Sequence, residues 1–164
     1  MAAGEAQTPP AVVRWQGDAN ELREAFVLRE RVFYGEQGVP REEDIDGLDD
    51  EAEHVVALSR EHGEVVGTLR LLVSGEKAKI GRVAVAPEWR RRGIASQMLE
   101  LAIARARERG SAKVRLAAQV AAIELYRQAG FAVESDVFEE AGIPHVWMGL
   151  SLSDGAAGDG AAGR

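Results

Sequence analysis

The segment Val83–Met98, VAVAPEWRRRGIASQM, decides how the rest of the chain is interpreted. An alternating β-branched run ends at Ala86, and three arginines then lead into a glycine and a helical pattern. A strand, a basic glycine turn and a helix N-terminus therefore follow one another directly. A helix N-terminus presents unpaired N–H groups and a partial positive charge, and Gly93 with Ala95 lets the backbone come close to an anion. The segment predicts a pyrophosphate-binding turn.

Composition limits the classes of protein that this chain can represent. It has 164 residues, a net charge of −7 and no cysteine. The acidic balance argues against a nucleic-acid partner, and the lack of cysteine excludes disulfides, a thiol nucleophile and thiolate metal sites. No apolar run approaches the length of a membrane span, and the first ten residues lack a signal-peptide pattern. We expect a cytoplasmic protein with no metal, no membrane partner and no nucleic-acid partner.

The hydropathy pattern predicts one domain over residues 11–152, after a flexible segment at 1–10 and before a disordered Gly/Ala-rich tail at 153–164. A helix separates the strands expected at 77–86 and 113–118, so these two should be parallel. The expected fold class is α/β (α+β), a mixed, mostly antiparallel sheet with helices on both faces. Strands are predicted at 11–15, 54–60, 64–73, 77–86, 113–118, 131–138 and 145–152, and helices from Asn20 (with Asp18 or Asn20 as N-cap), over 93–109 and over 120–129.

An acidic segment, REEDIDGLDDEAEH, covers residues 41–54. Charge runs are usually solvated, and a solvated loop is the favoured interpretation. The alternative is a wall of the binding site that attracts a cationic substrate through Glu36, Asp44, Asp46 and Asp49.

A second motif, Leu125–Phe131 (LYRQAGF), follows the strand expected beside the pyrophosphate turn. A lone tyrosine at a helix end is usually a half-buried amphipathic side chain. Here the topology places the Tyr126 hydroxyl near the same crevice as the turn. A phenol with an ordinary pKa of about 10 is protonated at neutral pH, so it can donate a proton to a leaving thiolate.

Together these segments resemble the GNAT (GCN5-related N-acetyltransferase) superfamily over about residues 11–152. VAVAPEWRRRGIA is similar to its coenzyme A motif, and LYRQAGF is similar to its Y-x-x-x-G-F motif. RVFYGEQGVPREEDIDGLDDEAEH and GIPHVWM are similar to a bacterial YjcF/ElaA-like subgroup. The resemblance implies the GNAT acyl-CoA N-acyltransferase fold. It also implies an N-acetyltransferase that moves an acetyl group from acetyl-CoA to a primary amine by direct attack.

The resemblance further implies roles for individual residues. The backbone of Val83 and Val85 would pair with the pantetheine arm of coenzyme A. Tyr126 would be the general acid for the departing thiolate. Gln119 stands where many relatives carry an asparagine that bonds the cofactor. The implied cofactor-binding residues are Val83, Ala84, Val85, Arg90, Arg91, Arg92, Gly93, Ile94, Ala95, Ser96, Gln119 and Tyr126.

The general base is not evident, because residues 81–83 read Gly-Arg-Val where many family members carry a glutamate. The candidates are Glu36, His54 and His145, or a water relay. On spacing alone His145 is an ordinary strand residue. The subgroup resemblance, through the segment GIPH, leaves a role in the site and an ordinary role in the strand equally open.

Two other functions stay open. R-x-x-V-F followed by an acidic D-x-D segment also resembles acyl-homoserine-lactone synthases. The missing strand carboxylate permits a non-catalytic acyl-CoA-binding sensor or interaction module. As an enzyme, the protein would act on a small-molecule or peptide amine, and a homodimer is an open alternative to a monomer.

Overall fold

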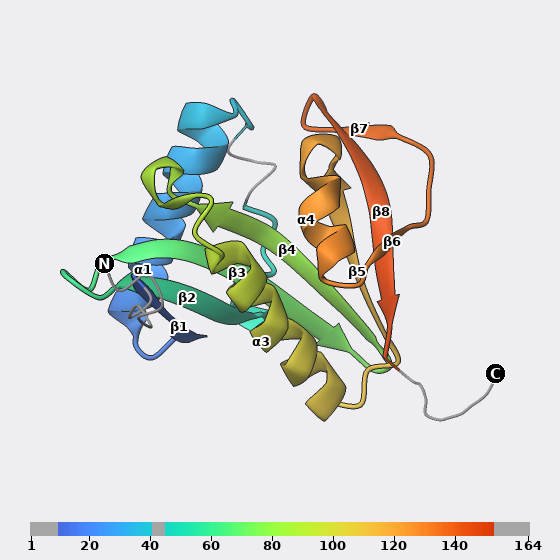
Figure 1. Cartoon of the computed structure of the whole chain (residues 1–164), viewed down its shortest axis with the longest axis horizontal. Coiled ribbons are helices and arrows are strands. Elements are labelled where there is room, and N and C mark those ends of the chain that lie inside the picture. The colour runs from blue at the N-terminus through green and yellow to red at the C-terminus, as the bar shows by residue number, and fades with distance from the viewer. Residues whose placement is uncertain (1–9, 41–44, 153–164) are drawn as a thin grey trace, which may run out of the picture.

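A computed structural model describes residues 10–40 and 45–152 (Figure 1). In that part of the chain eight strands form one sheet in the order β1-β2-β3-β4-β5-β8-β6, and β7 pairs separately with β8. The strands are β1 Ala11–Trp15, β2 Glu53–Ser59, β3 Val65–Ser74, β4 Lys77–Val85, β5 Lys113–Gln119, β6 Ala132–Val133, β7 Phe138–Glu140 and β8 Ile143–Ser151. The helical elements are α1 Ala19–Arg29, the π-helix η1 Glu30–Glu36, α3 Ile94–Glu108, α4 Ile123–Gln128 and the 3-10 turns η2 Asp49–Glu51, η3 Pro87–Trp89 and η4 Val120–Ala122.

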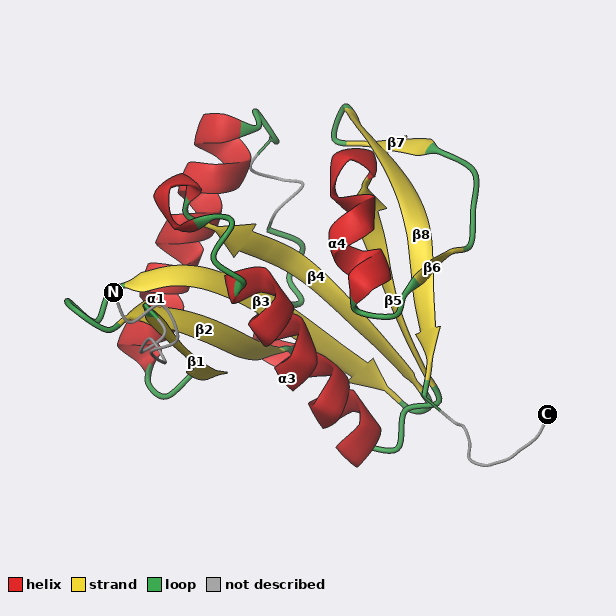
Figure 2. Ribbon diagram, in the orientation of Figure 1, coloured by secondary structure: helices red, strands yellow, loops and turns green. Residues whose placement is uncertain are grey.

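Helices cover both faces of the sheet, as the sequence predicts (Figure 2). In that view α3 and α4 lie in front of the sheet, and α1 lies behind β2 and β3. The face below α3 holds the larger core, where Met98 and Leu99 of α3 are fully buried. The face below α1 holds a smaller core around Leu28 and Val32. No helix in the described ranges has the length and apolarity needed to cross a membrane.

The centre of the fold is the junction between β4 and β5, which are parallel as predicted. They pair only over Lys77–Lys79 and Lys113–Arg115, and their later parts diverge (Figure 1). The register between β3 and β4 shifts between Thr68 and Arg70. Leu69 therefore faces two residues of β4, and one of them, Arg82, has a φ of +55°. An extra residue of this kind bends its strand, and the bend accounts for the divergence of β4 from β5.

One expectation about local structure is wrong. The strand predicted over 131–138 is divided into β6 and β7. Between them the Oγ of Ser135 accepts the backbone N–H of Trp147 at 2.9 Å, so a side chain replaces the backbone acceptor of the ladder. On α1, the apolar side chain of Phe26 is 36% exposed. Its ring packs edge-on to His54 and below the Arg29 guanidinium.

Candidate active site

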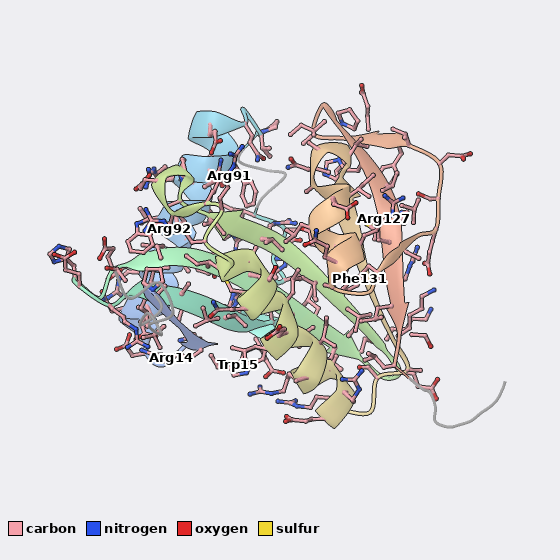
Figure 3. The ribbon with its side chains drawn as sticks, viewed as in Figure 1. Arg14, Trp15, Arg91, Arg92, Arg127 and Phe131 are labelled. Atoms are coloured by element: carbon pink, nitrogen blue, oxygen red, sulfur yellow. The ribbon has the colours of Figure 1, made fainter. Side chains whose placement is uncertain are left out.

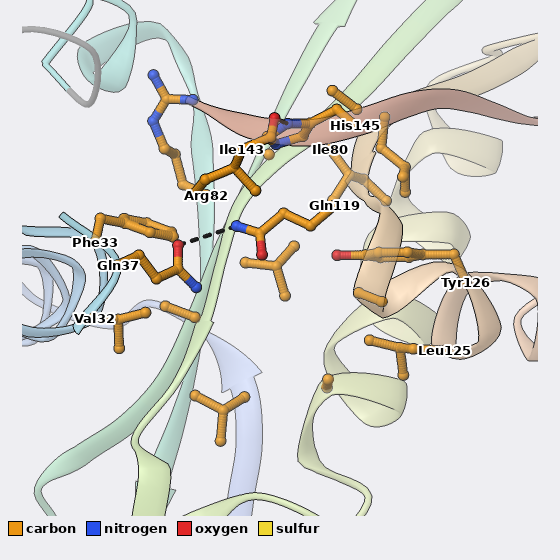
Figure 4. A pocket seen from close by; sticks show the side chains of 18 of the residues that line it. Val32, Phe33, Gln37, Ile80, Arg82, Gln119, Leu125, Tyr126, Ile143 and His145 are labelled. Atoms are coloured by element: carbon orange, nitrogen blue, oxygen red, sulfur yellow. Dashed lines mark hydrogen bonds between the residues drawn. The ribbon is translucent and has the colours of Figure 1, made fainter. Parts of the chain in front are cut away.

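A cavity of about 490 Å³ lies where β4 and β5 separate (Figure 4). Its walls come from η1, β4, the turn before α3, α4 and the β7–β8 hairpin. The cavity brings together most of the catalytic and cofactor-binding residues predicted from the sequence, whereas Arg92, Glu36 and His54 are not part of its wall. The predicted residues that line it are Val83, Ala84, Val85, Arg90, Arg91, Gly93, Ile94, Ala95, Ser96, Gln119, Tyr126 and His145.

The turn before α3 forms one end of this cavity. Gly93 is the N-cap of α3 with a φ of +80°, and no described side chain caps the helix. Arg91 also has a positive φ, +64°; Figure 3 shows it in this turn beside Arg92. An uncapped first turn leaves backbone N–H groups and the positive end of the helix dipole available to an anion. The turn therefore fits the diphosphate of a nucleotide-type cofactor.

The three arginines of the turn have different environments. Both Glu36 carboxylate oxygens accept hydrogen bonds from Arg90, each at 2.7 Å, and the Arg90 Nε donates to the Val85 carbonyl at 2.9 Å. Arg92 instead stacks on Trp89 and donates to a backbone carbonyl outside the cavity. The Arg90 guanidinium holds the pKa of the Glu36 carboxyl below its usual range. The geometry therefore assigns Glu36 to positioning Arg90 and does not support it as a base.

Tyr126 lies on α4 with its ring packed edge-on to Phe131. Its side chain is almost completely buried, but its hydroxyl points into the cavity (Figure 4). Burial raises the pKa of the phenol to about 12. Because desolvation disfavours the phenolate, Tyr126 remains an O–H donor at every physiological pH.

His145 lies on β8, opposite Gln119 of β5 in the strand register. Its Nδ1 is 2.7 Å from the Ile143 carbonyl oxygen, so Nδ1 must carry the hydrogen of that bond. In the neutral imidazole the Nε2 lone pair is then free to accept a proton. Phe138 stacks on the ring at 5.9 Å with an interplanar angle of 25°. The side chain is thus held in one orientation with a basic nitrogen available.

Tyr126 and His145 approach the cavity from opposite faces of the sheet. Tyr126 belongs to the core below α3 and α4, together with Val146. Successive strand residues alternate between faces, so His145 lies on the other face. The slot between β4 and β5 therefore has a proton donor on one side and a proton acceptor on the other.

A side-chain hydrogen bond crosses the slot. The Gln119 Nε2 donates to the Gln37 Oε1 at 3.0 Å, which joins the end of β5 to the residue after η1 (Figure 4). Gln37, Phe33 and Val39 line the cavity but were not predicted as site residues. The helical pattern that starts at Asn20 does not predict these three residues as part of the site, because helical spacing does not reveal that η1 ends beside β4.

The acidic segment is not a solvated loop at Asp46 and Asp49. Asp49 bonds Arg29 at 2.9 Å and Arg70 at 3.1 Å, and both guanidiniums are buried. Asp46 bonds Arg70 at 2.5 Å and Arg82 at 3.0 Å. These carboxylates are therefore engaged by the protein's own cations, and the alternative of a cation-binding wall is not supported for them. Asp44 lies outside the described residues.

His54, the remaining base candidate, is not part of the cavity wall. Its Nε2 is hydrogen-bonded to the Asp49 carbonyl oxygen at 3.0 Å, and burial lowers the pKa of its imidazole. The role that the structure supports is to hold the acidic segment against β2. In the described ranges, no group of three or more His, Asp or Glu side chains is arranged to bind a metal ion.

Comparison with known proteins identifies the class. The chain matches the model of the Acetyltransferase (GNAT) family over residues 19–131. It is 36% identical to the uncharacterized N-acetyltransferase YjcF of Bacillus subtilis over 129 residues, which cover 78% of this chain and 91% of YjcF. The crystal structure of Escherichia coli ElaA superimposes with a TM-score of 0.74 and 28% identity, covering 85% of this chain and all of ElaA.

The fold also resembles that of a GNAT family acetyltransferase from Elizabethkingia anophelis whose crystal structure has acetyl-CoA bound. That comparison gives a TM-score of 0.68 and 18% identity, covers 88% of this chain and all of the other, and so shows the fold alone. The family match and the YjcF relationship go further: the chain belongs to the GNAT family and is an N-acyltransferase by class. Within the family it belongs to the YjcF/ElaA-like subgroup.

Proposed function

We propose that this protein is an acetyl-CoA-dependent N-acetyltransferase that acts on a primary amine by direct attack. The observation that carries the proposal is the slot between β4 and β5, which connects the uncapped N-terminus of α3 to the Tyr126 hydroxyl and to His145. Acetyl-CoA, present in the Elizabethkingia anophelis structure, has a diphosphate at one end and a thioester at the other, which is the order of groups that this slot suits.

The cofactor end of the slot is built mainly from backbone. The first-turn N–H groups of α3, from Ile94 to Ser96, would hold the diphosphate, with Arg91 beside it. Beyond Lys79 the edge of β4 that faces β5 has no strand partner in the described ranges, so Val83 and Val85 can pair with the amide groups of pantetheine. Arg90 already donates to the Val85 carbonyl, which leaves that oxygen one further lone pair.

The reacting end of the slot holds the two side chains that can move protons. When bound, acetyl-CoA supplies an acetyl group activated as a thioester. His145 would accept a proton from the attacking amine at Nε2 as the C–N bond forms, and Tyr126 would act as general acid toward the sulfur as the C–S bond breaks. Their positions on opposite faces match an amine and a leaving group on opposite sides of the carbonyl carbon.

The raised pKa of Tyr126 defines how it acts. A phenol with a pKa of about 12 is a weaker acid than an ordinary thiol, whose pKa is about 8.5. Transfer of its proton to a fully formed thiolate is therefore unfavourable by several pKa units. The O–H instead stabilises negative charge as it develops on sulfur, and such charge-assisted hydrogen bonds contribute about 1.5–3 kcal/mol.

The test is a thiol-release assay with acetyl-CoA and a panel of primary amines, with the acetylated amine identified by mass spectrometry. The proposal expects thiol release that depends on the amine and equals the N-acetyl product formed. Acetyl-CoA binding by calorimetry without turnover on any amine would contradict it and favour the sensor. Lactone formation from a longer acyl donor would favour the synthase.

The role of His145 is tested by His145→Gln, which keeps a hydrogen-bonding side chain but removes the basic nitrogen. We expect kcat to fall by about 10²–10⁴-fold, the usual contribution of a general base. His62→Gln is the matched control, because His62 lies exposed in the β2–β3 turn. Turnover within twofold of the wild type in His145→Gln would assign proton removal to water.

A further inference from the structure

A cluster of four cations lies on the open face of the sheet, where β4 and β5 pair. Lys77 is the register partner of Lys113, and Lys79 is the register partner of Arg115. These residues alternate with the buried Ala78 and Val114, so all four side chains lie on the face opposite α3. Like charges directly opposite each other destabilise a sheet. Two such pairs in succession require compensation.

The protein's own side chains compensate the cluster only in part. Glu134 bonds Lys113 at 2.5 Å and lies 3.5 Å from Arg115. No carboxylate in the described ranges pairs with Lys79. Its ammonium lies over the Trp147 ring, 5.3 Å from the centroid, and the Arg115 guanidinium lies over the same ring at 4.5 Å. Two cations thus meet at one indole, in a protein whose net charge is −7.

This cluster is continuous with the cavity. Lys79 lines the cavity wall together with Arg82 and His145, at the end away from the α3 turn. Trp147 follows His145 by two residues on the same face of β8, and Phe138 stacks on both rings. The carboxylate on this end of the wall is Glu140, on β7. A molecule placed with its amine at His145 therefore extends along β8 toward Lys79 and Arg115.

We propose that the acceptor is an amine that also carries an anionic group, a carboxylate or a phosphate, and that Lys79 and Arg115 bind this group above Trp147. The inference rests on the proposed acetyltransferase activity and specifies its acceptor. His145 and Trp147 are two strand residues apart, which is about 7 Å. An acceptor with its amine at His145 and its anion above Trp147 therefore needs about this separation between the two groups. A chain the length of 6-aminohexanoate spans this distance, whereas the amine and carboxylate of an α-amino acid lie too close together.

The experiment compares matched acceptors in the thiol-release assay with the full-length protein. 6-Aminohexanoate is compared with 6-aminohexanamide, which has the same length without the charge, and with glycine and 8-aminooctanoate as length controls. A phosphate ester of 5-aminopentanol distinguishes the two anions. We expect kcat/KM for 6-aminohexanoate or the phosphate ester to exceed that for the amide about tenfold, the effect of one charge-assisted hydrogen bond. The preference should decrease as salt concentration rises.

The variant Lys79→Met tests whether Lys79 binds the anionic group of the acceptor. It should abolish the preference by raising KM for the anionic acceptor, so that the acid and the amide are used about equally. Lys77→Met is the matched control, because Lys77 lies on the same face of β4 but does not line the cavity. Turnover that is equal for the acid and the amide overturns this inference and leaves the proposed function intact. A preference that survives Lys79→Met overturns the assignment of the site. Absence of thiol release with every amine overturns the proposed function, and the inference with it.

Discussion

Replacement of Tyr126 by phenylalanine is the most direct test of the reacting end. The change removes only the hydroxyl, which points into the cavity (Figure 4), and keeps the ring that packs edge-on to Phe131 at 6.3 Å. The core is therefore conserved. The loss is one hydrogen bond to developing charge on sulfur, worth about 1.5–3 kcal/mol. At 1.36 kcal/mol per factor of ten, kcat should fall about 10–150-fold.

Two measurements separate this effect from binding. Steady-state thiol release gives kcat, and calorimetry gives the dissociation constant of acetyl-CoA, which we expect to change less than twofold. Most of the proposed cofactor contacts come from the turn before α3 and from β4, and not from the hydroxyl of Tyr126. Tyr34→Phe is the control, because Tyr34 is the other tyrosine of the chain and does not line the cavity. Unchanged turnover in Tyr126→Phe would refute the proposed stabilisation of charge on sulfur by the hydroxyl, and a weaker affinity with unchanged kcat would make Tyr126 a binding residue.

Three further predictions concern other parts of the fold. Gly93→Val should weaken coenzyme A binding about tenfold in calorimetry, because a β-branched residue at φ +80° strains the turn and its side chain enters the open space there. Gly110→Val is the control, because Gly110 has a similar φ of +82° but lies at the other end of α3, so the affinity for coenzyme A should not change. Asp49→Asn should cost about 3 kcal/mol of unfolding free energy in urea titration, because two buried guanidiniums lose a partner; a cost below about 0.5 kcal/mol would mean that the acidic segment does not stabilise the fold. Burial raises the pKa of Tyr126 from 10.0 to about 12 by disfavouring the phenolate, so the folded state loses roughly 3 kcal/mol of stability as pH rises from 10 through 12. Tyr126→Phe should therefore resist alkaline unfolding in that window, and an unchanged alkaline midpoint would contradict the raised pKa.

The parts of the site that follow one another along the chain could be predicted from the sequence. Alternation of Lys77, Ala78, Lys79 and Ile80 predicts a strand with one buried face, and Gly93 after three arginines predicts the turn and the helix start. These signals are local, because each depends on residues within one strand or one turn of helix. The parallel pairing of β4 and β5 follows from the intervening helix by the same kind of local reasoning.

The interactions between distant segments could not be predicted in this way. Glu36 and Arg90 are 54 residues apart, and only the folded chain shows that their side chains pair. The acidic segment likewise has the composition of a solvated loop, yet Asp49 finds two buried arginines on α1 and β3. The sequence carried one sign of this arrangement. An arginine within a strand pattern, such as Arg70, needs a carboxylate partner if it is buried.

The buried guanidinium of Arg70 explains why β4 carries no carboxylate at position 81, where many family members have a glutamate nearby. Gly81 lies opposite Arg70 of β3, and a Cβ at position 81 would be 3.9 Å from the Arg70 Nε. That Nε is buried and has no hydrogen-bond partner among the described residues. A glutamate at position 81 would therefore meet a buried guanidinium, which favours the ionised carboxylate and makes it a weak base. With glycine there, the base in the proposed mechanism comes from another strand. It is His145 of β8, whose Nδ1 is bonded to the Ile143 carbonyl oxygen.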